Sequence, residues 1–162
     1  MGGRIGLLGG LSIISSDHLP EPKMDGSVSV SSGFLTSDFR DKRLFSTGSV
    51  KIGSLSLDNV KIFWDIGAKV TIVYVPNIDM IGMKKVGSFA VTALDAGVMA
   101  DIFPATIDLS GGIKASLHVG VIPAAAEEPS FDSTDIILGM DVIEKGSLRI
   151  DGPNHKWSFK TR

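Results

Sequence analysis

Hydrophobic and polar residues alternate in short runs from about residue 50 onward. The alternation occurs at Val60, Ile62 and Trp64, at Val70 and Ile72, and at Leu117, Val119 and Val121. A period of two places alternate side chains on one face of a β-strand, and each run is only a few residues long. The pattern therefore predicts an all-β, or mainly β, domain in the form of a small barrel.

Turn-forming residues separate these runs. They lie at residues 57–59 (Leu-Asp-Asn), 95–97 (Asp-Ala-Gly), 110–112 (Ser-Gly-Gly) and 151–154 (Asp-Gly-Pro-Asn). Such residues suit hairpins and tight links. One short segment, residues 140–145, favours a helix, and Gly146 follows it in the usual position of a helix C-terminal glycine.

The first 45 residues differ from the rest of the chain. They are rich in Gly, Ser and Asp, contain Pro20 and Pro22, and show short apolar pieces without a sustained period. We expect residues 1–45 to form an arm that is flexible or partly ordered, and residues 46–162 to form the domain.

Composition narrows the class of protein. With 162 residues, 43% of them hydrophobic, the chain suits one domain with one core. A net charge of −2 over mixed acids and bases does not favour a nucleic-acid partner. No apolar stretch approaches the roughly 20 residues of a membrane span, so we expect no membrane partner. The chain has no cysteine and no metal-ligand spacing of histidines, so we expect no metal and a cytoplasmic location.

One acid has an unusual position. In the stretch KIFWDIGAKVT, Asp65 directly follows the apolar run Ile62-Phe63-Trp64 and precedes Gly67. A carboxylate at the end of a core strand costs free energy unless it is solvated, hydrogen-bonded or used in chemistry. Asp65 is therefore either a catalytic acid or a turn acid that hydrogen-bonds its own loop.

A second segment gives Asp65 a companion. The apolar strand Ile136-Ile137-Leu138 ends on Gly139 and leads into the predicted helix. Together the two segments resemble the retropepsin-like aspartic proteases, which include retroviral, retrotransposon and related single-domain proteases. In that family an apolar strand runs into Asp-Thr-Gly-Ala, and an apolar pair before Gly-Met-Asp packs across the active-site loop. The resemblance covers about residues 50–159, and it implies a closed β-barrel with a flap hairpin and one short helix, active as a symmetric homodimer.

The resemblance also implies roles for individual residues. Asp65 would be the catalytic acid, Ile66, Gly67 and Ala68 the rest of its loop, and Ile137, Leu138 and Gly139 the support of that loop. Residues 91–103 would form the flap, with Leu94, Asp95, Ala96 and Gly97 at its substrate-binding tip. A glycine there permits a positive φ and a close approach to a peptide backbone. The alternative for Gly97 is an ordinary hairpin glycine.

The implied chemistry needs two chains. The triplet Asp95-Ala96-Gly97 lies in a predicted hairpin, so Asp65 provides the one credible catalytic loop, and a symmetric partner would provide the second. The two Asp65 carboxylates would activate a water that hydrolyses a protein or peptide substrate, without a cofactor.

The sequence departs from the family at two positions. Ile66 stands where the family has Thr or Ser, whose hydroxyl group bonds across the dimer axis. Loss of this hydroxyl favours an alternative, a retropepsin-like dimer with weakened catalysis that binds peptides or serves as an assembly module. Lys69 stands where retroviral enzymes often place an acid, and a contact between Lys69 and Asp141 is a further hypothesis.

Overall fold

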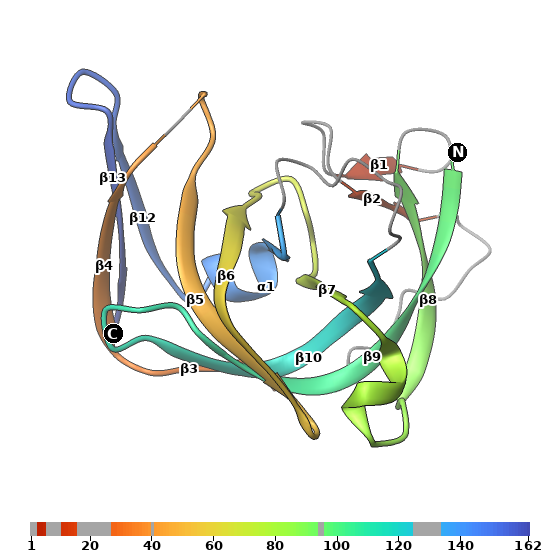
Figure 1. Ribbon diagram of the computed structural model, residues 1–162. Coiled ribbons are helices and arrows are strands. Elements are labelled where there is room, and N and C mark those ends of the chain that lie inside the picture. The colour runs from red at the N-terminus through yellow and green to blue at the C-terminus, as the bar shows by residue number, and fades with distance from the viewer. Residues whose placement is uncertain (1–2, 6–10, 16–26, 40, 94–95, 125–133) are drawn as a thin grey trace.

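Six strands of the protein close into a barrel in the computed structural model, which describes residues 3–5, 11–15, 27–39, 41–93, 96–124 and 134–162 (Figure 1). The strands are β1 (Gly3–Ile5), β2 (Leu11–Ser15), β3 (Ser29–Val30), β4 (Gly33–Asp38), β5 (Phe45–Ile52), β6 (Leu55–Trp64), β7 (Ile72–Val75), β8 (Gly87–Ala93), β9 (Ala96–Asp108), β10 (Lys114–Pro123), β11 (Ile136–Leu138), β12 (Gly146–Asp151) and β13 (Lys156–Thr161). The helical elements are a 3-10 helix, η1 (Ile78–Ile81), and an α-helix, α1 (Met140–Ile143).

The barrel is a mixed sheet. Its strands follow the order β9, β5, β6, β11, β7 and β10, and β10 pairs with β9 to close the ring. The pairs β6–β11 and β7–β10 are parallel, and the remaining pairs of the ring are antiparallel. The prediction of a mainly β protein with a closed barrel and one short α-helix is confirmed.

Strand β11 lies between β6 and β7, although β6 and β7 follow one another along the chain. It runs parallel to β6 and antiparallel to β7. Asp135, just before β11, fixes this arrangement: its Oδ2 accepts a hydrogen bond from Lys61 N at 2.7 Å, and its carbonyl oxygen accepts one from Tyr74 N at 2.8 Å. The connection from β6 to β7 must therefore pass the end of β11, and it contains Asp65.

The barrel interior and the three-stranded sheet β12–β13–β4 share the main apolar core. As the alternation predicts, Val60, Ile62 and Trp64 of β6 are buried there, and so are Leu117, Val119 and Val121 of β10. The core also takes in Trp157 and Phe159 of β13. Strand β13 is the middle strand of the small sheet, so its inward side chains join that sheet to the barrel.

Of the four predicted turns, two are confirmed and one is wrong, and the fourth, residues 95–97, begins at Asp95, which lies outside the described residues. Residues 110–112 form the turn between β9 and β10, and residues 152–155 join β12 to β13. Residues 57–59, by contrast, lie inside β6. The chain turns earlier, at Gly53, which has φ of 55°. Asn59 adopts φ of 53° at a β-bulge, where the register shifts between the pairs Gly48–Val60 and Val50–Leu57. Asn tolerates this left-handed conformation, so the residue that suggested a turn makes a bulge instead.

The predicted helix is confirmed, but its end differs from the prediction. The helix α1 ends at Ile143, and Gly146 begins β12 rather than capping the helix in a left-handed conformation. A Cβ atom at this position would lie 2.5 Å from Lys160 O and 2.6 Å from the Phe159 ring. Glycine is required there because β12 approaches β13 closely.

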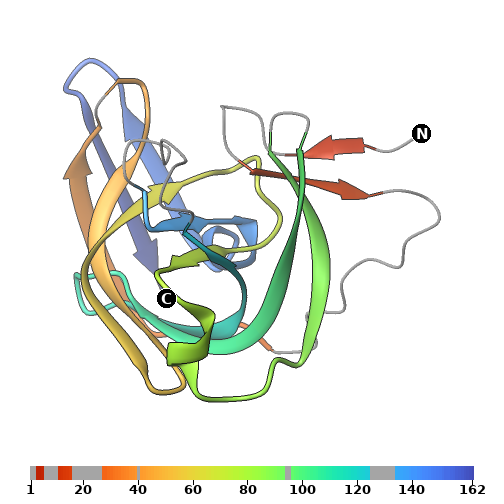
Figure 2. The same ribbon diagram turned by 45° about the vertical axis from the view of Figure 1, so that its right-hand side comes forward.

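Strands of the predicted arm belong to the sheets. Strand β3 pairs with β10, β4 pairs with β13, and Leu35 of β4 is buried in the main core. Strands β1 and β2 pair with each other, and β2 pairs with β8 (Figure 2). Residues 1–45 therefore contain strands that the sheets of the domain use. Within the described part of the chain, no helix has the length and apolar character needed to cross a membrane.

Candidate active site

The end of strand β6 holds Asp65 in place. Trp64, the last residue of β6, donates a hydrogen bond from Nε1 to Ser46 Oγ at 2.8 Å. Its ring also meets those of Trp157 and Phe159 edge-on, with ring centroids 4.9 Å apart in both pairs. The residue before Asp65 is thus fixed by packing and by a buried hydrogen bond.

The carboxyl group of Asp65 is buried, and only one of its oxygens has a partner among the described residues. Asp65 is 5% exposed, and Oδ1 accepts a hydrogen bond from Gly67 N at 2.9 Å. Oδ2 is buried and has no hydrogen-bond partner among the described residues. Burial raises the pKa of this carboxyl above its ordinary value, and hydrogen bonds from the backbone of Gly67 and Ala68 oppose that shift. Asp65 therefore hydrogen-bonds its own loop with one oxygen and leaves the other unsatisfied.

Strand β11 and the start of α1 lie across the Asp65 loop. Asp65 N donates to Leu138 O at 2.9 Å, and Met140 N donates to Ala68 O at 2.8 Å. The structure thus brings the predicted loop and its predicted support together. Figure 1 shows α1 next to the end of β6 and the connection that follows it.

Gly139 allows this close approach. A Cβ atom on Gly139 would lie 2.7 Å from both C and O of Val70 and 3.0 Å from Ala68 O. These are backbone atoms, which cannot rotate away as a side chain can. The requirement for glycine here is steric, because its φ of −97° suits any residue.

Thr71 and Asp141 form a polar link that the sequence did not predict. Thr71 N donates to Asp141 Oδ2 at 2.9 Å, and Thr71 Oγ1 donates to Asp141 Oδ1 at 2.8 Å. Lys69 meets Asp141 through the backbone instead, with Asp141 N donating to Lys69 O at 3.2 Å. The carboxylate partner is therefore Thr71 rather than the hypothesised Lys69. The available signal was a polar Thr inside an apolar strand pattern, which does not identify its partner.

The predicted flap is a hairpin formed by β8 and β9. The two strands pair from Gly87 opposite Ile102 to Ala93 opposite Ala96, so the hairpin is longer than the predicted residues 91–103. Leu94 and Asp95 lie outside the described residues. Gly97 is exposed in β9 without a positive φ, and a Cβ atom there would meet no atom within 4 Å. The expected conformational need for glycine at this position is not observed.

A second apolar cluster connects the Asp65 loop to the hairpin. Ala68 of the loop packs with Phe63, Ile72 and Ile137 of the neighbouring strands and with Phe89, Val91, Ala100 and Ile102 of the hairpin. This cluster is separate from the main core. The loop, its support and the base of the hairpin therefore form one packed unit.

Ile66 faces outward beside the buried acid. Its side chain is 65% exposed, whereas Asp65 is 5% exposed. An exposed large apolar side chain in a tight loop has an unfavourable contact with water. Ile66 also cannot make the hydrogen bonds that Thr or Ser would make.

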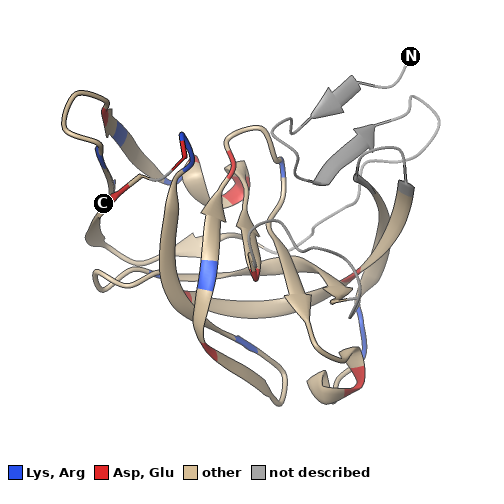
Figure 3. Ribbon diagram, turned by 45° about the horizontal axis from the view of Figure 1, so that its top comes forward, with Lys and Arg blue, Asp and Glu red and all other residues tan. Residues whose placement is uncertain are grey.

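The described residues give no support for a metal site near this loop. Acidic and basic residues are spread over several elements (Figure 3), and the described residues contain no group of three or more His, Cys, Asp or Glu placed to hold a metal ion. No protein-family model matches the chain, and a search of curated proteins finds no match.

Proposed function

We propose that the protein is an aspartic endopeptidase of the retropepsin type, active as a homodimer in which each chain contributes Asp65. The observation that carries the proposal is the buried carboxyl of Asp65 at the end of a barrel strand, with one oxygen that has no hydrogen-bond partner among the described residues. The hydrogen-bonded contact of its loop with the segment around Gly139 adds support. The motif resemblance and the closed barrel are consistent with the same function.

Two Asp65 carboxyls related by a two-fold axis would share one proton. Two like charges at short range cannot both ionise cheaply, which is general for aspartic proteases. The charged carboxylate takes a proton from water, and the water oxygen attacks the carbonyl carbon of the peptide bond. The protonated carboxyl gives its proton to the carbonyl oxygen. The carboxyl that took up the water's proton then passes it to the leaving amine as the C–N bond breaks, and the other carboxylate takes back a proton from a hydroxyl group of the intermediate.

The apolar cluster beneath the hairpin suggests the substrate class. An extended peptide bound between the Asp65 loop and the β8–β9 hairpin would pass near Ala68, Val91 and Ile102, which belong to this cluster. Apolar side chains on either side of the scissile bond would extend the cluster and lose their contact with water. We therefore expect cleavage between apolar residues.

Catalysis has one structural requirement. Asp65 Oδ2 exposes almost no surface in the single chain. The surroundings of Asp65 must therefore open, or rearrange on dimer formation, before a water and a peptide can reach it.

A second candidate function rests on Ile66. Its exposed apolar side chain and missing hydroxyl suit a dimer that is held by an apolar contact and binds peptides or assembles without efficient hydrolysis. In such a module Asp65 would act as a turn acid through its hydrogen bond from Gly67.

The test is a peptide-library cleavage assay from acidic to neutral pH, with and without a statine-type inhibitor. The wild-type protein, Asp65→Asn and the control Asp79→Asn, which alters an exposed acid of η1, are compared. We expect cleavage by the wild type and the control, no cleavage by Asp65→Asn, and a fall in specific activity on dilution through the range of dimer dissociation.

The outcomes separate the two candidates. Cleavage by Asp65→Asn at the wild-type rate would exclude Asp65 as the catalyst. An inactive wild-type dimer that still binds the statine peptide would favour the binding module. Full activity of a species that remains monomeric would contradict a site shared between two chains.

A further inference from the structure

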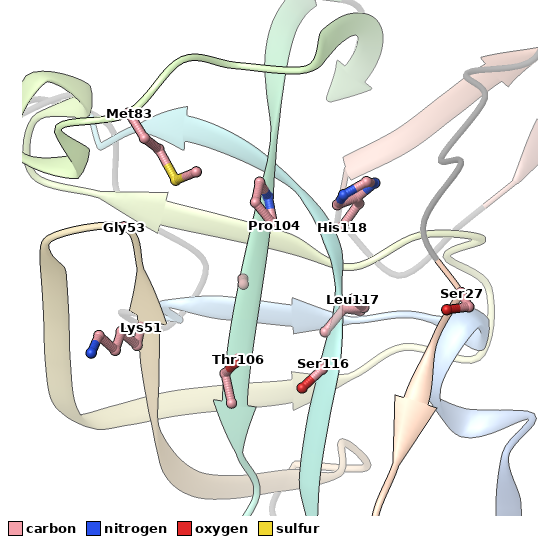
Figure 4. A pocket seen from close by; sticks show the side chains of 10 residues that line it. Ser27, Lys51, Gly53, Met83, Pro104, Thr106, Ser116, Leu117 and His118 are labelled. Carbon is pink, nitrogen blue, oxygen red and sulfur yellow. The ribbon is translucent and has the colours of Figure 1, made fainter.

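A pocket of about 560 Å³ lies on the outer face of the barrel, over β5, β9 and β10 (Figure 4). This volume falls in the range of roughly 300–1,000 Å³ that is usual for small-molecule sites. The pocket shares no residue with the Asp65 loop or with the β8–β9 pairing. It is therefore a separate site from the proposed active site.

The floor of the pocket is a row of polar side chains on adjacent strands. Lys51 of β5 lies opposite Thr106 of β9, and Thr106 lies opposite Ser116 of β10. Directly paired residues project from the same face of a sheet, so these three side chains stand side by side. All three are exposed, and Figure 4 shows Thr106 and Ser116 on adjacent strands and the long side chain of Lys51 extending outward from β5. Ser27 adds a further hydroxyl group at the rim.

The polar groups of the floor are available to a ligand. The side chains of Lys51, Thr106 and Ser116 make no hydrogen bond or ion pair with another described residue. No Asp or Glu is present among the described residues that line the pocket. The lining therefore offers one cation and several hydroxyl donors without a competing negative charge, which suits an anion.

His118 provides another donor. It lies opposite Pro104 in the β9–β10 pairing and lines the pocket. Its Nδ1 is buried and has no hydrogen-bond partner among the described residues. In the tautomer with the proton on Nε2, the buried Nδ1 carries a lone pair and Nε2 can donate to a ligand.

One wall of the pocket is apolar. Met83 lines it, and Met83 is 42% exposed. Its neighbours in the same segment, Met80 and Val86, are 52% and 59% exposed. Flexible methionine side chains adapt to apolar ligands of different shapes. A ligand with an apolar tail could therefore cover this segment while its anionic group meets the polar floor.

We propose that this pocket binds a small amphipathic anion, with a carboxylate or phosphate group on Lys51, Thr106, Ser116 and His118 and an apolar tail against Met83. The charge of the floor selects the sign of the head group, and the exposed methionine selects an apolar tail.

Octyl phosphate and octanoate are the probes, and octylamine, octanol and inorganic phosphate are the comparison compounds. Binding is measured by calorimetric titration of the full chain and by changes in its amide NMR spectrum. We expect saturable binding of both probes, and weaker binding of octanol and of inorganic phosphate. Lys51→Met keeps the aliphatic stem and removes the charge, and it should weaken octyl phosphate binding by about tenfold or more.

Two variants serve as controls. Lys114→Met removes an exposed lysine at the start of β10, outside the pocket lining, and Asp65→Asn alters the proposed active site. Both should bind octyl phosphate with wild-type affinity. The proposal is overturned if the probes do not saturate, if Lys51→Met binds as tightly as Lys114→Met, or if octylamine or inorganic phosphate binds as tightly as octyl phosphate. Lys51 is exposed, so its substitution should leave the fold intact, and circular dichroism checks this.

Discussion

Thr71 and Asp141 join the end of the Asp65 loop to the start of α1. The backbone N–H and the hydroxyl group of Thr71 both donate to the carboxylate of Asp141, at 2.9 and 2.8 Å. The same hydroxyl accepts a hydrogen bond from Gly139 N at 3.1 Å. One buried side chain therefore holds both the helix and the glycine that lies across the loop.

Thr71→Val should destabilise the fold. Valine keeps the shape of threonine but lacks the hydroxyl group. Gly139 N then loses its acceptor, and Asp141 Oδ1 loses one of its donors. We expect a loss of about 1–3 kcal/mol in the free energy of unfolding. Thr71→Ser keeps the hydroxyl and should lose only about 1 kcal/mol for the missing methyl group. Urea denaturation of both variants is the measurement, and equal losses would contradict a role for the hydroxyl group.

Gly139→Ala should also destabilise the fold. The added methyl group would meet backbone atoms of Val70 at 2.7 Å, so the loop must move. Overpacking of this kind costs about 1–3 kcal/mol, and movement of the loop should also lower any peptidase activity. Gly152→Ala is the matched control, because a Cβ atom there meets nothing within 4 Å. Thermal or urea denaturation that shows the same stability for both variants would contradict the steric requirement at Gly139.

The strand content could be predicted from sequence because alternation is a local property. Val60, Ile62 and Trp64 are buried on one face of β6 as their spacing predicts. The bulge at Asn59 could not be predicted, because Asn suits a turn and a bulge equally and the partner strand decides between them. The use of β3 and β4 in the sheets depends on pairing with β10 and β13, which lie far away in sequence.

The candidate site was predicted in part. The contact of the Asp65 loop with Leu138 and Gly139 followed from a motif resemblance between two separated segments. Three features could not be predicted from local sequence: the burial of Asp65, the exposure of Ile66 and the link from Thr71 to Asp141. They depend on how segments that are distant in the sequence pack together.

Asp65 and Asp141 should contribute less stability as the pH rises from acidic values toward neutrality. Burial raises the pKa of Asp65 above its ordinary value of 3.8, and it raises the pKa of Asp141 in the same direction. Between the ordinary and the raised pKa, the folded chain binds more protons than the unfolded chain. Stability contributed by these groups is therefore complete below pH 3.8 and is lost as the pH rises through the folded pKa.

Asp65→Asn tests the contribution of Asp65 to this pH dependence. Asparagine cannot ionise, so the variant should gain stability relative to the wild type as the pH rises, and the gain should be largest at neutral pH. Urea denaturation at a series of pH values in dilute solution gives the difference. Asp79→Asn, at an exposed position, should show no such trend. A constant difference between Asp65→Asn and the wild type at all pH values would contradict the raised pKa.

Ile66→Thr tests whether a hydroxyl group restores the contact between two active-site loops. The side chain of Ile66 is 65% exposed in the single chain, so the substitution should change the stability of the single chain by less than about 0.5 kcal/mol. Any larger effect on the dimer must therefore arise at its interface. Each hydrogen bond regained across the two-fold axis should tighten the dimer by about 1 kcal/mol, and peptidase activity should rise with it.

Ile66→Val is the matched control for this prediction, because valine has the shape of threonine without its hydroxyl group. Dimer dissociation by sedimentation and peptide turnover are measured for wild type, Ile66→Thr and Ile66→Val. A Thr variant that dimerises more tightly and cleaves faster than the Val variant supports the protease, since the hydroxyl is the difference between them. If the Thr dimer is instead weaker and inactive, Ile66 makes an apolar contact that a buried, unpaired hydroxyl disrupts, at a cost of roughly 1–3 kcal/mol. That result would favour the binding module, because the loop would then be built for apolar association in place of the hydrogen bonds that align two catalytic carboxyls.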